Sequence, residues 1–339
     1  MIDTAKFEFF MIREALSKLK KRDSSNCNGV VFYGNGFYLR GDFIAARTRI
    51  NFNLERRVFW VELSLPKFVQ GHNVFGTNRL LVLCGEVVKR VYARLGIELS
   101  ERAWGQIKKS RIRLKRLDIA CSFRVGSPGN VNAALECLFE YMRAESRNWS
   151  AHGAAHTESV YNRQHSKRVS DKFYNKYKEL LVNKIPLAVK CREMLMESAK
   201  SIVRYEVTFR AAELKSLNLE FADQWNRKVV RELLISRIKR LKLSGQFNSS
   251  EDVSSPAYLN DSSKMFLGLW SKGADLHVYK NCKTLLRARS ALIESCGIDV
   301  FKKARSRKSL DLGAMLSVEN AIFSAPKRLV RKGLIFGRS

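Results

Sequence analysis

The chain has 339 residues, and its 62 lysines and arginines against 32 aspartates and glutamates give a formal net charge of +30. This charge favours a polyanionic partner, above all nucleic acid, because basic side chains that neutralise phosphates release condensed counterions; an anionic membrane surface or simple solubility is the alternative. With 45% hydrophobic residues and only 5 prolines, the chain is not a disordered basic tail.

The sequence also limits the compartment. It holds no apolar run of about 18 residues and does not begin like a secretory signal, and its 7 cysteines never show Cys-x-x-Cys spacing. We therefore expect a cytosolic protein that does not associate with membranes and has neither a disulfide framework nor a zinc ribbon.

The first predicted elements are a helix and a hairpin. Residues 11–22 form an amphipathic helical pattern. Residues 29–43 read as two short strands around the turn Gly34-Asn35-Gly36, since an Asn-Gly pair between apolar residues is a strong hairpin signal.

One pattern of alternating apolar and polar residues recurs at three places farther along the chain. Apolar and polar residues alternate through 58–65, 116–123 and 202–210, which predicts strands with one apolar face. Each strand places one carboxylate in the middle of its other face, and these carboxylates are Glu62, Asp118 and Glu206.

Helical patterns lie between these strands, at 80–95, 130–145, 171–182 and 186–198. Strands that alternate with helices and hairpins predict an α+β fold, with a nuclease-like catalytic domain built on an antiparallel sheet. We expect this nicking and joining domain to cover residues 1–215.

Residues 216–339 form the second predicted domain, which is mostly helical. A long basic helix at 221–243 and a polar loop at 244–256 precede two helices at 265–272 and 280–296. The two helices either form a helix-turn-helix that reads DNA or pack as a helical hairpin on the first domain. A basic, partly disordered tail is expected from 302 to 338.

The stretch 159–179 places tyrosines among lysines and arginines. On a helix, Tyr174, Tyr177 and Lys178 would share one face, with Lys176 close by. A cation near a phenol lowers its pKa and neutralises a phosphate under attack, which suggests DNA cleavage through a covalent bond to tyrosine. The alternative is a surface helix whose tyrosines pack on the sheet.

Hard oxygen ligands suggest a magnesium or manganese site. Glu62, Asp118 and Glu206 could supply it, although Arg116 with Asp118 and Arg204 with Glu206 could instead form ion pairs. Two glycines bracket His72 in a predicted tight turn, where this histidine either binds the metal or hydrogen-bonds within the loop. His152 and His156 are a weaker candidate pair, since no acid is adjacent.

Basic residues around these candidates are predicted to contact DNA phosphates. They are Arg163, His165, Lys167 and Arg168 in the tyrosine stretch, Arg116 and Arg204 on the strands, and Arg287 and Arg289 in the last predicted helix.

Several motifs together resemble the filamentous-phage gene II/gene X family of rolling-circle replication initiation proteins. The most specific is Leu65-Pro-Lys-Phe-Val-Gln-Gly-His-Asn-Val-Phe-Gly76, and the resemblance covers most of the chain from about 58 to 299. The others follow in order: Lys115-Arg-Leu-Asp-Ile-Ala120, His165-Ser-Lys-Arg168, Phe173-Tyr-Asn-Lys176, Ile202-Val-Arg-Tyr-Glu206, Leu269-Trp-Ser-Lys-Gly273 and Thr284-Leu-Leu-Arg-Ala-Arg289 with Cys296-Gly-Ile-Asp299.

The resemblance implies a metal-dependent enzyme that nicks one strand of supercoiled phage origin DNA, stays joined to the 5′ phosphate and later rejoins the displaced strand. It implies Tyr174 as the nicking residue and Tyr161 as the second choice, while spacing alone suggests Tyr177 for a second transesterification. No His-x-His occurs, so the metal set would be Glu62, Asp118, Glu206 and His72. Host helicase and polymerase would be partners in the bacterial cytoplasm.

The rival interpretation is a non-catalytic DNA-binding protein, such as a repressor or replication-control factor that uses the helices between 265 and 296. It predicts binding to origin duplex without a magnesium-dependent nick.

Overall fold

The structure is a computed structural model that describes residues 1–21, 30–40, 47–145, 149–152, 158–241, 243, 259–271, 274–296, 298–301 and 311–336. Within these ranges, a ten-stranded sheet has the order β2-β3-β4-β1-β5-β9-β8-β7-β6, with β10 pairing with β5, and the strands pair antiparallel throughout. The strands are β1 (Ile2–Phe10), β2 (Gly36–Arg40), β3 (Arg47–Asn53), β4 (Val58–Ser64), β5 (Arg113–Arg124), β6 (Trp149–His152), β7 (Ser159–Asn162), β8 (Val169–Asn175), β9 (Ile202–Arg210) and β10 (Ala321–Ile322).

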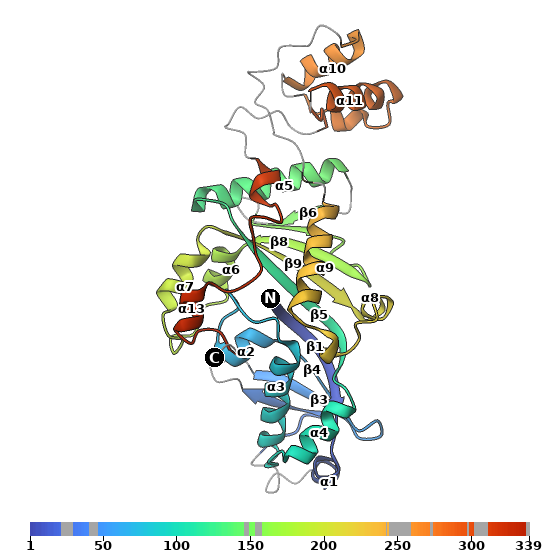
Figure 1. Cartoon of the computed structure of the whole chain (residues 1–339). Helices are drawn as coiled ribbons and strands as arrows, with labels where there is room; N and C mark the ends of the chain where they lie inside the picture. The colour runs from blue at the N-terminus through green and yellow to red at the C-terminus, as the bar shows by residue number, and fades with distance from the viewer. Residues whose placement is uncertain are drawn as a thin grey trace.

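Helices alternate with the strands along the chain, and several of them cover the sheet (Figure 1). They are α1 (Arg13–Lys21), α2 (Leu65–Gln70), α3 (Leu80–Arg94), α4 (Glu101–Lys109), α5 (Pro128–Glu145), α6 (Lys176–Val182), α7 (Arg192–Ala199), α8 (Ala211–Ser216), α9 (Arg227–Arg240), α10 (Asp261–Ser271), α11 (Lys283–Cys296), α12 (Leu312–Met315) and α13 (Lys327–Arg331), with short 3-10 turns at Ala222–Gln224 and Leu276–Tyr279. The predicted α+β class with an antiparallel sheet and a helical C-terminal region is confirmed.

The apolar face of the sheet forms the main core. The alternation predicted for β4, β5 and β9 buries residues such as Phe59, Ile119 and Val207 against α1, α3, α5 and α9. Full burial of each such side chain stabilises the fold by about 1.5–3 kcal/mol. The strands therefore form because their apolar residues recur with period two.

The opposite face, which we call the polar face, carries Glu62, Asp118 and Glu206. A second apolar cluster, from the loop after α2 together with α6, α7 and the segment 325–335, packs over one part of it. In Figure 1, α6, α7 and α13 lie together near the chain's two ends. This cover turns part of the polar face into a buried polar layer.

The largest error of prediction concerns 171–182. The chain stays extended as β8 through Asn175, and α6 begins only at Lys176, where the Asn175 side chain accepts a hydrogen bond from Lys178 N at 3.1 Å. Tyr174 is therefore on a strand and Tyr177 on a helix, so the shared helical face predicted for them is wrong. β8 pairs along its whole length with β9, which overrides the local helical spacing.

Strand β1 was not predicted, although it lies between β4 and β5 in the sheet. In the hairpin region, Phe32 does bridge Phe37 around the Asn-Gly turn, but β2 makes its main pairing with β3, which was also not predicted. The helices predicted to begin at 186 and 221 begin instead at Arg192 and Arg227.

The C-terminal region contains two kinds of segment. Residues between Leu259 and Phe301 form an apolar cluster of their own, in which α10 packs on α11. Residues 311–336 are ordered and return to the sheet, where β10 pairs with β5. The whole predicted loop at 244–256 and the start of the tail lie outside the described residues. The domain boundary near 215 and the helix-turn-helix remain predictions.

Candidate active site

Cross-strand pairing arranges the polar face in rows. One row runs from Tyr161 on β7 through Lys172 on β8 and Glu206 on β9 to Ala120 on β5. The next row runs from Ser159 through Tyr174 and Arg204 to Ser122. Paired residues share a face of the sheet, so the candidate nucleophiles and Glu206 lie side by side.

Tyr174 is bound to a carboxylate. Its hydroxyl donates a hydrogen bond of 2.6 Å to Glu206 Oε1, and the residue is only 5% exposed. Burial first, and then the charge of Glu206, hold the pKa of the Tyr174 phenol well above its usual range. The phenol is therefore neutral at rest, and its proton already points at an acceptor.

Lys172 lies between the two candidate tyrosines. Its Nζ is 4.3 Å from the centroid of the Tyr174 ring and 5.3 Å from that of Tyr161. Tyr161 is half-buried, and its ring also meets that of the exposed His152 at 5.1 Å. A cation so placed can neutralise a phosphate that approaches either phenol.

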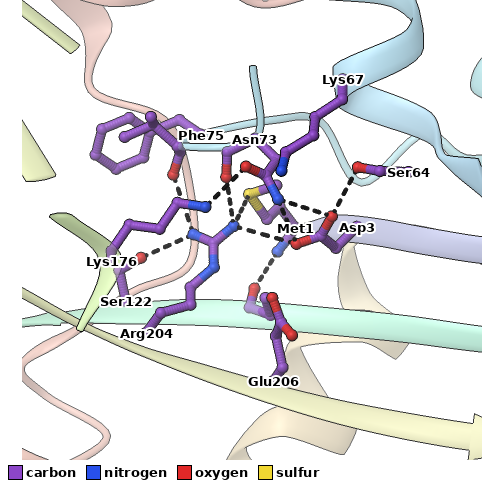
Figure 2. Close-up of polar contacts among 12 residues, drawn as sticks. Met1, Asp3, Ser64, Lys67, Asn73, Phe75, Ser122, Lys176, Arg204 and Glu206 are labelled. Carbon is purple, nitrogen blue, oxygen red and sulfur yellow. Dashed lines mark hydrogen bonds and ion pairs between the residues drawn. The ribbon is translucent and has the colours of Figure 1, made fainter. Parts of the chain in front are cut away.

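Glu206 shares its surroundings with Asp3 of β1. Strand β5 lies between β1 and β9, and its residue opposite Glu206 is Ala120, which has a small side chain. Figure 2 shows Asp3 and Glu206 on the same side of the sheet. Burial and then the charge of Asp3 raise the pKa of Glu206 to about 7. Burial alone would also raise the pKa of Asp3, but Arg204 and Lys176 outweigh it and lower that pKa to about 2. Asp3 is thus the permanently ionised member of the pair.

Arg204 is the centre of the buried polar layer, at 1% exposure. Its Nη1 donates to Val74 O at 3.0 Å and Ser122 Oγ at 2.9 Å, and its Nη2 donates to Asn73 O at 2.8 Å. The Nη2 atom lies 3.8 Å from Asp3 Oδ2, so the ion pair predicted with Glu206 forms with Asp3 instead. Arg204 therefore fixes the loop after α2 to the sheet.

A chain of hydrogen-bonded side chains holds Asp3 in place. Asn73 Nδ2 donates to the Asp3 oxygens at 3.1 and 3.2 Å, while Asn73 Oδ1 accepts from Lys176 Nζ at 2.7 Å (Figure 2). Lys176, fully buried, also donates to Glu179 Oε2 at 2.6 Å, and Glu179 in turn pairs with Lys67 at 2.9 Å. Burial, opposed by Glu179, lowers the pKa of Lys176 to about 8. Lys176 thus orients Asn73.

The loop that carries Asn73 is closed at both ends by glycine. Gly71 ends α2 at φ 80°, a left-handed conformation that favours glycine. A Cβ at Gly76 would lie 3.1 Å from Met1 Cε, so the loop approaches the first residue closely. The chain bends at Gly71 and again at residues 74–75, but the His72 and Asn73 side chains are buried and do not face outward as a tight turn on the surface would present them.

His72 makes hydrogen bonds within the fold. Its Nε2 donates to Leu334 O at 2.9 Å, and its Nδ1 lies 3.4 Å from Gln70 Nε2. Burial lowers the pKa of His72 to about 4, so the ring is neutral. Both ring nitrogens are engaged, and the side chain holds the C-terminal segment against the loop.

The other predicted metal ligands are dispersed. Arg116 binds both Asp118 oxygens at 2.9 and 2.7 Å and also reaches Glu62 at 2.9 Å. Among the residues that the structure describes, no group of three or more His, Cys, Asp or Glu side chains is arranged to hold a metal ion. The predicted set of Glu62, Asp118, Glu206 and His72 is thus not assembled, whereas Glu206 and Asp3 lie together. Of the predicted histidine pair, His156 falls outside the described residues.

The remaining catalytic candidates lie away from Glu206. Tyr177 is half-buried in the apolar cluster over the polar face, and Lys178 is exposed, with its Nζ 3.6 Å from Glu158.

The predicted DNA contacts fall in different places. Arg163, His165, Lys167 and Arg168 are exposed at the turn between β7 and β8, where Arg168 pairs with Glu213 at 2.8 Å. Arg287 is exposed on α11, whereas Arg289 binds Asp299 through both oxygens at 2.6 and 2.7 Å.

Sequence reasoning missed three residues of the site: Asp3, Asn73 and Lys172. Asn73 lay inside the noted glycine-bounded loop, and Lys172 lies two residues before Tyr174, the spacing that places both on one strand face.

None of the described helices has the length and apolar character needed to cross a membrane. Comparisons with known proteins point to replication. The family model for the N-terminal region of the phage gene II replication-associated protein matches residues 1–228. The chain is 27% identical over 249 residues to the gene II replication-associated protein of Enterobacteria phage I2-2, covering 71% of this chain and 69% of that protein.

A weaker likeness is to the solved structure of a rolling circle replication initiator protein from Geobacillus stearothermophilus. It has 12% identity and a TM-score of 0.29, and covers 69% of this chain and 83% of that chain. So weak a likeness supports no argument about this chain.

Proposed function

Because the chain belongs to the family of phage gene II replication-associated proteins, whose N-terminal model it matches, we propose that it starts rolling-circle replication by nicking and rejoining one DNA strand at the phage origin. The hydrogen bond of 2.6 Å from the Tyr174 hydroxyl to Glu206, with Lys172 beside the ring, carries this proposal. It is the arrangement of a nucleophile with its base and a nearby cation.

In the proposed reaction, Glu206 takes the phenolic proton along the existing hydrogen bond. The Tyr174 oxygen attacks the scissile phosphorus, the bond to the 3′ oxygen breaks, and that oxygen leaves and takes a proton from water. Lys172 and Arg204 supply positive charge near the developing anion. The phosphotyrosine keeps the phosphodiester energy, so attack by a later 3′ hydroxyl rejoins the strand without ATP. The free 3′ hydroxyl would prime host polymerase behind a host helicase.

A divalent ion, Mg²⁺ or Mn²⁺, fits Asp3 and Glu206 better than the dispersed set predicted from sequence. Two carboxylates that share a buried space suit such an ion, which commonly binds one or two carboxylates together with substrate phosphate. When bound, it would add charge stabilisation at the phosphate. The protein's own part is to hold Asp3 ionised and in place through Asn73 and Arg204.

Tyr161 is the second candidate nucleophile, because it is more exposed than Tyr174 and lies on the other side of Lys172. Tyr177 is a weaker candidate, since it packs in the apolar cluster.

The test uses supercoiled plasmid that carries the cognate phage origin, with Mg²⁺, followed by denaturing gels. We expect relaxed product and protein-linked 5′ ends from the native chain and from Tyr161→Phe, and neither from Tyr174→Phe. Adducts from Tyr174→Phe would move the assignment to Tyr161. Binding to origin duplex without nicking by the native chain would favour the rival, a DNA-binding repressor or replication-control protein.

A further inference from the structure

A row of cations crosses the polar face at Arg210, the last residue of β9 and the one farthest from Arg204 on that face. Lys6 on β1 pairs with Arg116 on β5, and Arg116 pairs with Arg210 on β9. The backbone N–H of Arg210 then bonds to Arg168 O at 2.8 Å, which brings the base of the β7–β8 turn beside it. Like charges directly opposite one another on neighbouring strands are destabilising, so this row is costly unless anions lie near it.

Protein carboxylates neutralise only one side of the row. Lys6 and Arg116 share Glu62, at 3.5 and 2.9 Å, and Arg116 also binds Asp118. Arg210 donates its Nε to Ser166 O at 2.6 Å, and its terminal guanidinium nitrogens make no hydrogen bond or ion pair with the part of the chain that the structure describes. Arg210 is half-buried on the sheet, and in the register of β9 it belongs to the same face as Glu206, so its charge lies on the polar face without a protein carboxylate bound to it among the described residues.

The row has a fixed position relative to the proposed reaction. Arg210 lies four residues beyond Glu206 on β9, on the same face, which corresponds to about 13 Å along the strand. Thr208, with Asp118 opposite it, lies between them. A DNA strand with one phosphate at Tyr174 and its chain running along β9 therefore passes over Arg210 within a few nucleotides.

We propose that Arg210, flanked by Arg116 and Lys6, binds a backbone phosphate of single-stranded DNA next to the cleavage site. We take the polymer as single-stranded because Tyr174 is a strand residue only 5% exposed on the face of the sheet, which a flexible single strand can approach more closely than a stiff duplex. A basic groove that follows the backbone is the usual form of such sites. The direction of the DNA strand along β9 follows from the proposed function, so this proposal rests on that function.

The experiment measures binding of a labelled oligothymidylate by fluorescence anisotropy over a series of salt concentrations. Removing one phosphate contact on a single strand lowers the slope of log K against log salt by about 0.7. We expect this loss from Arg210→Gln, recovery with Arg210→Lys, and no change from Lys109→Gln, an exposed lysine of α4 that alters the net charge equally.

Lys6→Gln is a second variant that keeps the Arg210–Ser166 contact, and it should also lower the slope. If Arg210→Gln is shown by circular dichroism to be misfolded, Lys6→Gln decides. If the folded variants keep the slope of log K against log salt of the native chain, the proposal is overturned.

Nicking of origin plasmid is measured separately. If the slope is lowered in Arg210→Gln while the native chain forms no covalent adduct, the phosphate site stands and the proposed function fails. If the native chain forms adducts while the slopes of Arg210→Gln and Lys6→Gln are unchanged, the function stands and the phosphate site fails.

Discussion

Arg204 with Asp3 and Lys6 with Glu62 are two ion pairs on the same face of the same sheet, yet their side chains are 1% and 4% exposed in the first pair and 44% and 41% in the second. The first pair lies under the loop after α2, and backbone carbonyls, Ser122 and Asn73 bind its terminal nitrogens and carboxylate oxygens, whereas the buried Arg204 Nε has no hydrogen-bond partner among the described residues. The second pair faces solvent. A buried charge is tolerated only with nearly complete partners, whereas an exposed pair contributes little to stability and stays available to a ligand.

The largest expected effect comes from removing the buried cation. Arg204→Met leaves Asp3 without its nearest charge and frees the loop after α2, so the free energy of unfolding should fall by about 3–5 kcal/mol. Urea denaturation followed by circular dichroism measures it. Adding Asp3→Asn to this variant should recover part of the loss, and an unchanged midpoint in the single variant would show that the pair is not a structural centre.

Acidification should destabilise the fold at His72, because protonation places a charge on a buried ring. The pKa of His72 is lowered from 6.5 to about 4 in the folded state, so the unfolded chain binds a proton first as the pH falls. His72 therefore contributes stability above pH 6.5, which is lost between pH 6.5 and 4 and amounts to about 3 kcal/mol. The measurement is the difference in unfolding free energy between the native chain and His72→Gln across this range. A difference independent of pH would contradict the buried, neutral histidine.

Lys176→Met tests whether the hydrogen bonds of Lys176 stabilise the layer that holds Asp3 in place. The variant loses charged hydrogen bonds to Asn73 and Glu179, while Glu179 keeps Lys67, so we expect a loss of about 2–3 kcal/mol in unfolding free energy. Lys178→Met, on the exposed side of the same helix, is the matched control and should change stability little. Equal effects of the two substitutions would remove the distinction between the buried layer and the surface.

The smallest effect is expected at the exposed pair. Lys6→Gln should change the unfolding free energy by less than about 1 kcal/mol, because solvent screens the pair with Glu62. Thermal unfolding of the native chain and of the variant, measured in parallel, tests this prediction. A larger loss would mean that the cation row supports the fold and is not free to bind a ligand.

Period-two alternation predicted three central strands of the sheet, β4, β5 and β9, but not β3, β7 or β8. The strands predicted at 58–65, 116–123 and 202–210 are confirmed. Their residues alternate because one face of each strand packs against helices, and their carboxylates lie on the other face. In β1 the register with β5 shifts between Ile2 and Ala5, beside Asp3, but the residues from Ala5 to Phe9 do alternate, so this strand carried a period-two signal that the prediction missed.

Tyr174 illustrates a different limit. Its spacing to Tyr177 and Lys178 matches a helix, but pairing of β8 with β9 on one side and β7 on the other keeps it extended. Asn175 did carry a local signal, since asparagine is a preferred N-cap. The contact between Asp3 and Arg204 joins residues far apart in the sequence, and no local pattern indicates it.

The most direct test of the proposed function is to identify the amino acid that becomes joined to DNA. The native chain is incubated with origin plasmid and Mg²⁺, digested with nuclease and protease, and the nucleotide-bearing peptide is sequenced by mass spectrometry. The proposed function predicts a nucleotide on Tyr174, at the end of its hydrogen bond to Glu206. A nucleotide on Tyr161, or nicked plasmid without any modified tyrosine, would contradict it.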